Sequence, residues 1–290
     1  MAASINLETA RTFLLTHARL IERLRYEFLF EDGPSERVVA ALAPYQNADG
    51  GFGNALEPDL RGAESQPVPV WSAFGVLDEC DDFDRPIVER ACAFLSSITS
   101  SEGGVPFVLP SVSHSPHAPW WTIGDSPSAS LNPTGGLVGY LNKHMVKNSW
   151  LAPAEAFCWA AIEQLHETSP YELGNILSFL ESAPDRDRAE TAFARIARIV
   201  RQQGFIELDP DAGGEVHFPL TFAPSPTSLG RRLFSDEVIE ANVDALIRQQ
   251  QPDGGWTVNW MIWTPITEHE WRGVRTVEVL HTLKNYGRVS

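Results

Sequence analysis

Polar residues crowd a short stretch between positions 54 and 66, and two carboxyl groups there could perform acid–base chemistry. The stretch contains Asn54, Glu57, Asp59, Arg61, Glu64 and Gln66. Only Pro58 separates Glu57 from Asp59, and proline restricts the backbone between them. Two neighbouring carboxyl groups raise one another's pKa, so that one can stay protonated as an acid while the other acts as a base or stabilises positive charge. We therefore predict Glu57 and Asp59 as a catalytic pair; the alternative is that these charges form surface ion pairs and cap the following helix.

A second stretch combines two histidines, adjacent tryptophans and an acid, namely His114, His117, Trp120, Trp121 and Asp125. Long loops of this kind often cover binding sites. The two histidines and Asp125 do not have the spacing of an established metal site, so we expect no metal there and no cofactor. Trp120 and Trp121 could stack on a ligand or cover the core, and we predict both as substrate-binding residues.

Aromatic residues also gather near the C-terminal end of the chain, at Trp256, Trp260, Trp263 and Trp271. Ring faces attract positive charge, so a wall of such rings suits an apolar or cationic guest; the alternative is that the rings belong to the core. We predict three of them as substrate-binding residues, Trp256, Trp260 and Trp271. Glu268 lies beside them as a third candidate acid, and Arg272 is a further substrate-binding candidate that could hold a phosphate or pair with the carboxylates near position 57.

Helical periodicity runs through most of the chain and must position these residues. Apolar side chains recur at intervals of three and four residues, and no alternating strand pattern of comparable length competes. The segment from Ser169 to Glu172 has the form of a capping box with proline at the first helical position. The pattern predicts an all-α fold, with helices near residues 5–28, 35–44, 66–80, 85–99, 130–146, 153–166, 170–182, 185–203, 235–250 and 269–285.

Glycine pairs punctuate the connections between these helices. Two strong copies share Gln, then Asp-Gly-Gly, then an aromatic ring, over residues 46–52 and 250–256, and two weaker copies lie at residues 103–104 and 213–214. Glycine permits the positive φ of a tight turn, Asp can accept from the backbone two residues on, and the ring can pack back on the helices. Successive helix pairs joined by such turns predict a closed ring or a solenoid, because one hairpin cannot bury both of its faces.

The two strong copies resemble the QW repeat of squalene-hopene cyclases and the Gly-Gly-Phe turns of protein prenyltransferase β subunits. The resemblance covers most of residues 35–285 as a periodicity of helix pairs. It implies membership of the terpenoid cyclase and protein prenyltransferase superfamily, and a single α/α toroid domain over residues 1–290. Closing such a ring would bring the first and last helix pairs together, and with them the tryptophans near position 256 and the segment 46–66.

The chain departs from the catalytic motifs of these families. Class II triterpene cyclases carry a proton donor in Asp-x-Asp-Asp, whereas the nearest string here, residues 78–82, has Cys80 at the central acidic position. Prenyltransferase β subunits bind zinc through an Asp-x-Cys pair and a distant His. Asp78, Cys80 and His281 match that set only in residue type, because Asp78 and Cys80 close a helix instead of opening one.

Composition narrows the classes of partner and compartment. The formal net charge of -16 repels polyanions, and the absence of a basic stripe excludes nucleic acid as a partner. Three cysteines within apolar helical patterns indicate small core residues in a reduced interior, not a disulfide framework. Without a signal peptide or a run of about 18 apolar residues, we expect a cytoplasmic protein with no transmembrane segment. Composition does not decide whether the protein contacts a membrane surface or forms a homo-oligomer.

The resemblance and the residues together give three hypotheses. The first is a terpenoid cyclase-like enzyme of the lyase or isomerase class, in which a carboxylic acid protonates a small hydrophobic isoprenoid and aromatic rings stabilise cationic intermediates. The second is an α/α-toroid carbohydrate enzyme, hydrolase or lyase, with the same acids and with tryptophans stacked on sugar faces. The third is a non-catalytic binding or assembly protein. A mostly apolar lining favours the first, and many polar groups beside a few rings favour the second.

Overall fold

A computed structural model describes residues 4–83, 86–122 and 127–289. Within these ranges the secondary structure is helical, with isolated β-bridges and no strand, so the predicted all-α fold is confirmed. The α-helices are α1 Leu7–His17, α2 Leu20–Phe30, α3 Ser35–Leu42, α4 Pro67–Glu79, α5 Pro86–Ser97, α6 Leu131–Lys143, α7 Leu151–Gln164, α8 Pro170–Ser182, α9 Arg186–Gln203, α10 Pro219–Phe222, α11 Asp236–Arg248 and α12 Pro265–Asn285. Short 3-10 helices cover Ala43–Tyr45, Pro110–His114 and Leu229–Leu233.

Contacts divide the chain into two compact units. Unit 1 combines Met1–Ala41 with Gly204–Ser290, and unit 2 is Leu42–Gln203. The single α/α toroid domain expected over residues 1–290 remains a prediction. In both units helix follows helix along the chain, as in the α/α fold class.

Helix boundaries follow local sequence signals. Proline occupies the first turn of α4, α8, α10 and α12, where its missing N–H leaves no hydrogen bond unmade. Ser169, Ser235 and Thr264 cap α8, α11 and α12 with side-chain oxygens. The helix predicted over residues 5–28 is instead two, because the backbone is extended at Ala18 and Arg19. The four-residue α10 was too short for its periodicity to be seen.

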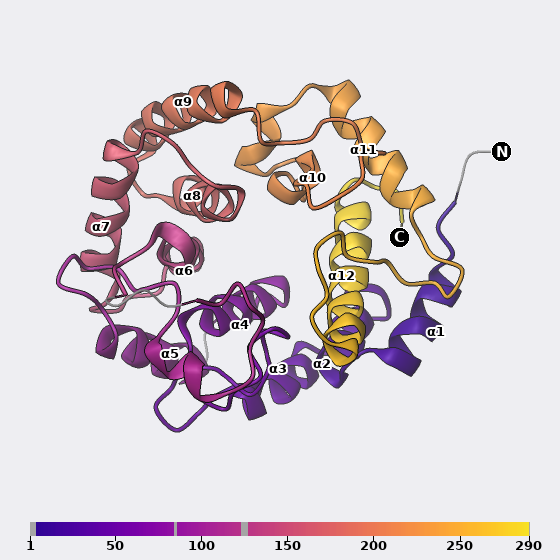
Figure 1. Ribbon diagram of the computed structural model, residues 1–290, viewed down its shortest axis with the longest axis horizontal. Helices are drawn as coiled ribbons and strands as arrows, with labels where there is room; N and C mark the ends of the chain where they lie inside the picture. The colour runs from indigo at the N-terminus through magenta and orange to yellow at the C-terminus, as the bar shows by residue number, and fades with distance from the viewer. Residues whose placement is uncertain (1–3, 84–85, 123–126, 290) are drawn as a thin grey trace. The chain divides into compact units, whose positions relative to one another are not determined.

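In unit 2, α4, α6 and α8 lie side by side and run parallel in register. Tyr140 of α6 lies against Gly75 of α4, and Lys143 of α6 forms an ion pair with Asp78 one turn further along α4. Gly139 of α6 likewise packs on Ser178 of α8. Residue numbers increase together in these pairs, which only parallel helices allow. Figure 1 shows α5, α7 and α9 as a second layer against these three.

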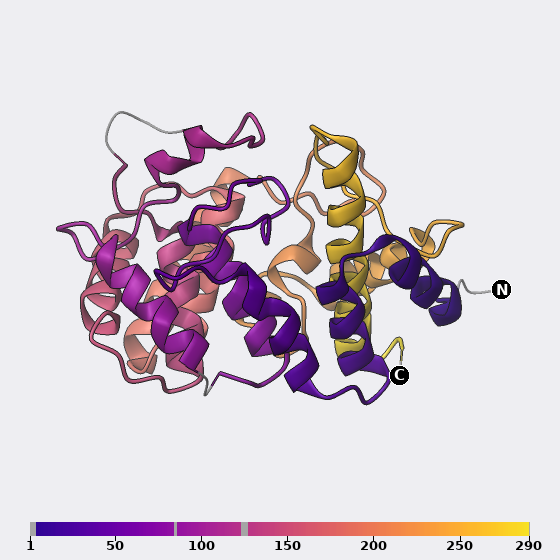
Figure 2. The ribbon, with the colours of Figure 1, turned by 90° about the horizontal axis from the view of Figure 1, so that it is seen from below.

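In unit 1, the first and last helices of the chain pack together. α12 contacts α1, α2 and α11, and Figure 2 shows α12 alongside α1 and α2. The shared core includes buried residues from both ends of the sequence, among them Phe13, Leu14, Val243, Trp256, Val277 and Leu280. The expected meeting of the first and last helix pairs is therefore confirmed for α1, α2 and α12.

The two strong glycine turns have the same hydrogen bonds. Asp49 Oδ1 accepts from Gly51 N (2.9 Å), and Asp253 Oδ1 accepts from Gly255 N (3.1 Å). The side chain of the preceding Gln donates to the carbonyl of the first glycine in both turns, at 2.9 and 3.0 Å. The first glycine has a φ of 92° in one turn and 97° in the other, where a side chain is strained. The predicted turn chemistry is thus present in both.

Each turn is seated on a helix that offers a carbonyl and, four residues later, a phenylalanine ring. A Cβ on the first glycine would overlap the carbonyl of Arg90 in one turn and of Thr9 in the other. A Cβ on the second glycine would meet the ring of Phe94 or of Phe13, at 2.8 and 2.7 Å. The weaker copy at residues 103–104 uses Pro153 and Phe157 in the same way. The turns therefore lock onto α5, α7 and α1.

The copy at residues 213–214 is not equivalent. Its positive φ falls on the second glycine, and a Cβ on either glycine would meet nothing within 4 Å. This segment is a surface loop, held by hydrogen bonds from Asn259 to the carbonyls of Gly214 and Val216. The weaker copy at residues 213–214 is therefore not a turn of the same kind.

The three cysteines are free and buried, as their apolar settings indicated. Among the described helices, none combines the length and the apolar character that crossing a bilayer requires. Peripheral membrane contact and self-association remain predictions.

Candidate functional site

The predicted acids Glu57 and Asp59 lie in a closed loop that leads into α4. Asn54 N donates to Gly62 O (2.8 Å), so the two ends of residues 54–62 meet. Both acids are buried, with exposed fractions of 7% and 3%. Both also make polar interactions within the protein. Buried carboxyl groups this close in sequence are uncommon outside ion-pair networks and functional sites, so the loop remains the leading candidate for acid–base chemistry.

The backbone just before Glu57 is strained. Asn54 and Ala55 have φ angles of 56° and 62°, a left-handed region that side chains other than those of Gly, Asn and Asp seldom occupy. Of the two, Ala55 is the strained residue, at a cost on the order of 1–3 kcal/mol, and such strain concentrates at functional sites. Leu56 and Glu57, which follow directly, are both buried.

The predicted histidine–tryptophan segment pairs with this loop. Ala118 N donates to Asp59 O (2.9 Å) and Arg61 N donates to Pro116 O (3.0 Å). An isolated antiparallel bridge joins Leu60 to His117 between these bonds. Two of the three sequence segments proposed as functional are therefore neighbours in unit 2.

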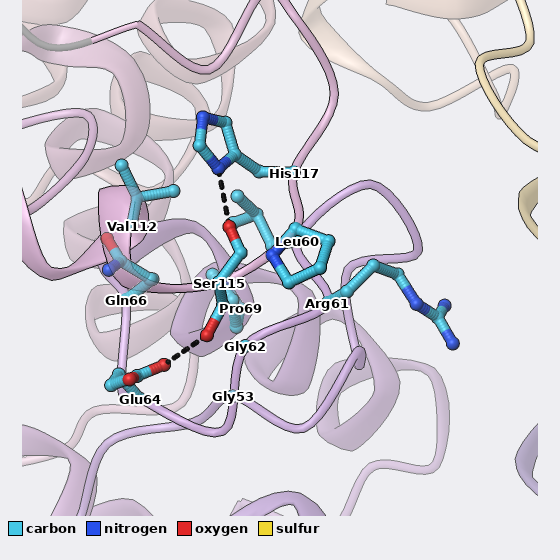
Figure 3. A pocket seen from close by; sticks show the side chains of 11 residues that line it. Gly53, Leu60, Arg61, Gly62, Glu64, Gln66, Pro69, Val112, Ser115 and His117 are labelled. Carbon is cyan, nitrogen blue, oxygen red and sulfur yellow. Dashed lines mark hydrogen bonds between the residues drawn. The ribbon is translucent and has the colours of Figure 1, made fainter.

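A small pocket separates the two segments (Figure 3). Ser115 joins them, since its hydroxyl donates to Glu64 (3.1 Å) and its carbonyl accepts from His117 Nδ1 (2.7 Å). The cavity volume is about 10 Å³, which is room for roughly one water molecule. Arg61 extends away from it in Figure 3. The pocket is too small for a substrate.

The adjacent tryptophans have different settings. Trp121 is buried and stacks on Phe107, with ring centroids 4.7 Å apart, and its Nε1 has no hydrogen-bond partner among the described residues. Trp120 is 39% exposed and is available to a ligand. Trp121 is therefore mainly core, and Trp120 remains a candidate contact.

The non-buried side of helices α4, α6 and α8 carries aromatic and polar groups. We call it the open face; it consists of Trp71, Ser72, Gly75, Asp78, Asn132, Tyr140, Lys143, Tyr171, Gly174, Ser178 and Glu181, none of which is buried. They recur at helical spacing, so each helix presents them as one stripe. Every Ala, Val, Leu, Ile and Phe of these helices is buried. The open face therefore offers aromatic rings, hydroxyls, one amide and the charged groups of Asp78, Lys143 and Glu181, and no aliphatic side chain.

The third predicted segment lies in unit 1. Trp260 and Trp271 meet edge to face, with ring centroids 5.2 Å apart, and both are partly exposed. Glu268 is exposed in the first turn of α12. Met261 and Ile266 are exposed by 59% and 54%, so this segment presents an apolar surface. The expected approach of these residues to the segment 46–66 stays a prediction.

Two predicted substrate-binding residues instead hold the fold of unit 1. Trp256 is 2% exposed, and its Nε1 donates to Leu246 O (2.8 Å) inside the core. Arg272 donates to both carboxylate oxygens of Asp253, at 2.9 and 2.8 Å, and its guanidinium lies over the ring of Phe13. Trp256 therefore belongs to the core. Arg272 forms a bidentate ion pair that braces the turn at Asp253. We remove both from the ligand-binding set.

The metal alternatives gain no support from the described residues. No group of three or more His, Cys, Asp and Glu side chains among them could hold a metal ion. Asp78 pairs with Lys143 and His144, both at 2.7 Å, and so ties α4 to α6. His117 donates to a carbonyl, and Asp125 lies outside the described residues.

Comparisons with known proteins show likeness in fold. No protein-family model matches the chain, and no curated protein matches it. The crystal structure of a protein from Actinoplanes is 16% identical, with a TM-score of 0.56 over 97% of this chain and 98% of that chain. A type II terpene cyclase, MstE_D109A from Scytonema in complex with merosterolic acid A, is 14% identical, with a TM-score of 0.49 over 96% of this chain and 85% of that chain. At these identities the comparisons concern the fold and not the reaction.

Proposed function

We propose that the protein is an enzyme of the α/α class that acts on a carbohydrate, as a hydrolase or a lyase, with Glu57 and Asp59 as its acid–base pair. The observation that carries this proposal is the composition of the open face. Its exposed side chains are aromatic or polar, and none is aliphatic. An apolar guest would gain little there, whereas a sugar ring has apolar C–H faces for aromatic rings and hydroxyls for amides.

The acids supply the reaction. In a hydrolase, one carboxylic acid protonates the glycosidic oxygen as the C–O bond breaks, and the other carboxylate activates water or stabilises the cationic sugar. In a lyase, a carboxylate removes a proton beside the bond and the acid protonates the leaving oxygen. Burial of Glu57 and Asp59 strengthens each electrostatic interaction that these groups make.

The test is turnover of an oligosaccharide panel with cello-, malto-, xylo- and galacturonide hexamers, read as new reducing ends and as ultraviolet absorbance of an unsaturated product. Glu57→Gln and Asp59→Asn keep shape and remove the acid, so each should slow turnover by about 100-fold or more. The matched control is Glu64→Gln, because Glu64 lies in the same loop region but is exposed and bonded to Ser115. Full activity in both acid variants, or no turnover of any member, would exclude the proposal.

A second candidate is the terpenoid cyclase-like enzyme, which protonates an isoprenoid and stabilises cationic intermediates on aromatic rings. The apolar segment of unit 1, with Trp260, Met261, Ile266 and Trp271 exposed or partly exposed, favours it. Geranylgeraniol should then quench tryptophan fluorescence, and Trp271→Ala should weaken that binding without loss of helical content. Quenching by the isoprenoid together with silence from every sugar would replace the first proposal with this one. Silence from both probes would favour a non-catalytic protein.

A further inference from the structure

Three helices converge on a single buried glycine, Gly136 of α6, which lies against Trp71 of the open face. A Cβ on Gly136 of α6 would overlap Nε1 of Trp71 from α4 and Oδ1 of Asn175 from α8, and would lie 2.7 Å from Cδ1 of Trp71. The indole edge and the carboxamide thus meet over the Cα of Gly136. Any side chain at position 136 would push one of them away, so the absence of a side chain places the ring.

The carboxamide of Asn175 is fully used in orienting its neighbours. Its oxygen accepts from Gly136 N (3.2 Å), and its nitrogen donates to Tyr171 O (2.9 Å) and to Asn132 Oδ1 (3.1 Å). Asn175 is only 5% exposed, so this network is shielded from water. The last bond sets the orientation of the Asn132 carboxamide. Because its oxygen faces Asn175, its amide nitrogen points away from Asn175.

Two donor groups beside the exposed ring have no hydrogen-bond partner among the described residues. They are the amide nitrogen of Asn132 and Nε1 of Trp71, whose side chains are half-buried and 37% exposed, respectively. Tyr171, which is 58% exposed, is on the same face. An aromatic face flanked by donors that lack acceptors matches a ligand with a flat C–H face and several oxygen acceptors.

We infer that Trp71 and Asn132 form a sugar-binding subsite, in which one pyranose ring stacks on Trp71 and a ring hydroxyl accepts a hydrogen bond from Asn132. This inference rests on the proposed function for its ligand class, and it adds the residues that select the substrate. Asn175 is a positioning residue, since it acts on the ligand through Asn132. A site that hydrogen-bonds a hydroxyl rejects analogues that lack it, so Asn132 sets specificity.

The experiment is calorimetric titration of the full-length protein with the cello-, malto-, xylo- and galacturonide hexamers. Trp71→Ala should weaken binding of the hexamer that binds wild type by about 10-fold or more. Asn132→Asp keeps the oxygen that accepts from Asn175 and replaces the donor with an acceptor, so it should weaken binding by about 10-fold at an unchanged melting temperature. Asn142→Ala, at the other end of α6, is the matched control and should bind as wild type does.

Gly136→Ala gives an independent test of the geometry. The added methyl group must displace Trp71 or Asn175, so binding should fall even though neither ligand-contacting residue is changed. A measured melting temperature shows whether Gly136→Ala is folded. If it is not folded, the result for Asn132→Asp decides the test.

The binding and turnover experiments distinguish failure of the acid–base assignment from failure of the subsite. If Glu57→Gln removes turnover but binds hexamer as wild type does, both proposals stand. If Glu57→Gln and Asp59→Asn leave turnover intact while Trp71→Ala removes binding, the acid assignment fails and the subsite stands. Equal affinity in wild type, Trp71→Ala and Asn132→Asp overturns the subsite, and so does failure of every hexamer to bind wild type.

Discussion

Replacing Gly254 with alanine should destabilise the protein far more than the same change at Gly214. Both glycines have nearly the same positive φ, 97° and 95°. A Cβ at Gly214 meets nothing within 4 Å, so Gly214→Ala has only the conformational strain, about 1 kcal/mol. A Cβ at Gly254 would overlap the carbonyl of Thr9, a backbone atom that can move only if α1 moves.

Overpacking of this kind adds about 2 kcal/mol to the strain, for a total of about 3 kcal/mol. For a domain of this size the melting temperature falls by about 2–4 °C for each kcal/mol, so Gly254→Ala should melt about 4–8 °C below Gly214→Ala. The assay is thermal unfolding followed by far-ultraviolet circular dichroism, with Gly174→Ala as a control at an unobstructed helical glycine. Equal melting temperatures for the Gly254 and Gly214 variants would show that the turn is not seated on α1.

Further predictions concern titration and reactivity. Burial opposes ionisation of Asp253, but hydrogen bonds from Arg272 and Gly255 leave its pKa below the usual value. Its stabilisation is present above the ordinary Asp pKa of about 4 and is lost as pH falls, so wild type should lose stability relative to Asp253→Asn in acid melts. A constant difference between the two melts across that range would contradict this. Burial raises the pKa of the Cys92 thiol to about 12 and raises that of Cys158 further, so native protein at pH 8 should resist iodoacetamide at both, and only unfolding should expose them. Mass spectrometry that finds rapid alkylation of the folded chain would refute their burial.

The helices could be predicted from sequence because their apolar periodicity is local. The break at Ala18 and Arg19 could not, because neither residue is a strong helix breaker and the contact of Ala18 with Gly273 of α12 is not visible in the local sequence. The helices that receive the glycine turns share a sequence pattern that could have identified them. Ala10, Ala91 and Ala154 each precede a phenylalanine by three residues on the helix that receives a turn.

The site was only partly visible in the sequence. The acidic loop was found because its residues are consecutive, whereas Trp71, Asn132 and Asn175 are far apart and meet only through the register of three parallel helices. Trp256 is buried and Arg272 is paired with Asp253, and composition alone cannot distinguish a ring that lines a cavity from one that fills a core. Both features depend on tertiary contacts.

A crystal structure of Glu57→Gln soaked with the oligosaccharide that binds wild type would test the central claim most directly. The variant should hold the substrate uncleaved. We predict a pyranose ring on the face of Trp71, a hydroxyl bonded to Asn132, and a glycosidic oxygen within hydrogen-bond distance of residue 57 or 59. A sugar bound away from the α4–α6–α8 open face, or one whose glycosidic oxygens all lie beyond reach of both residues, would contradict it.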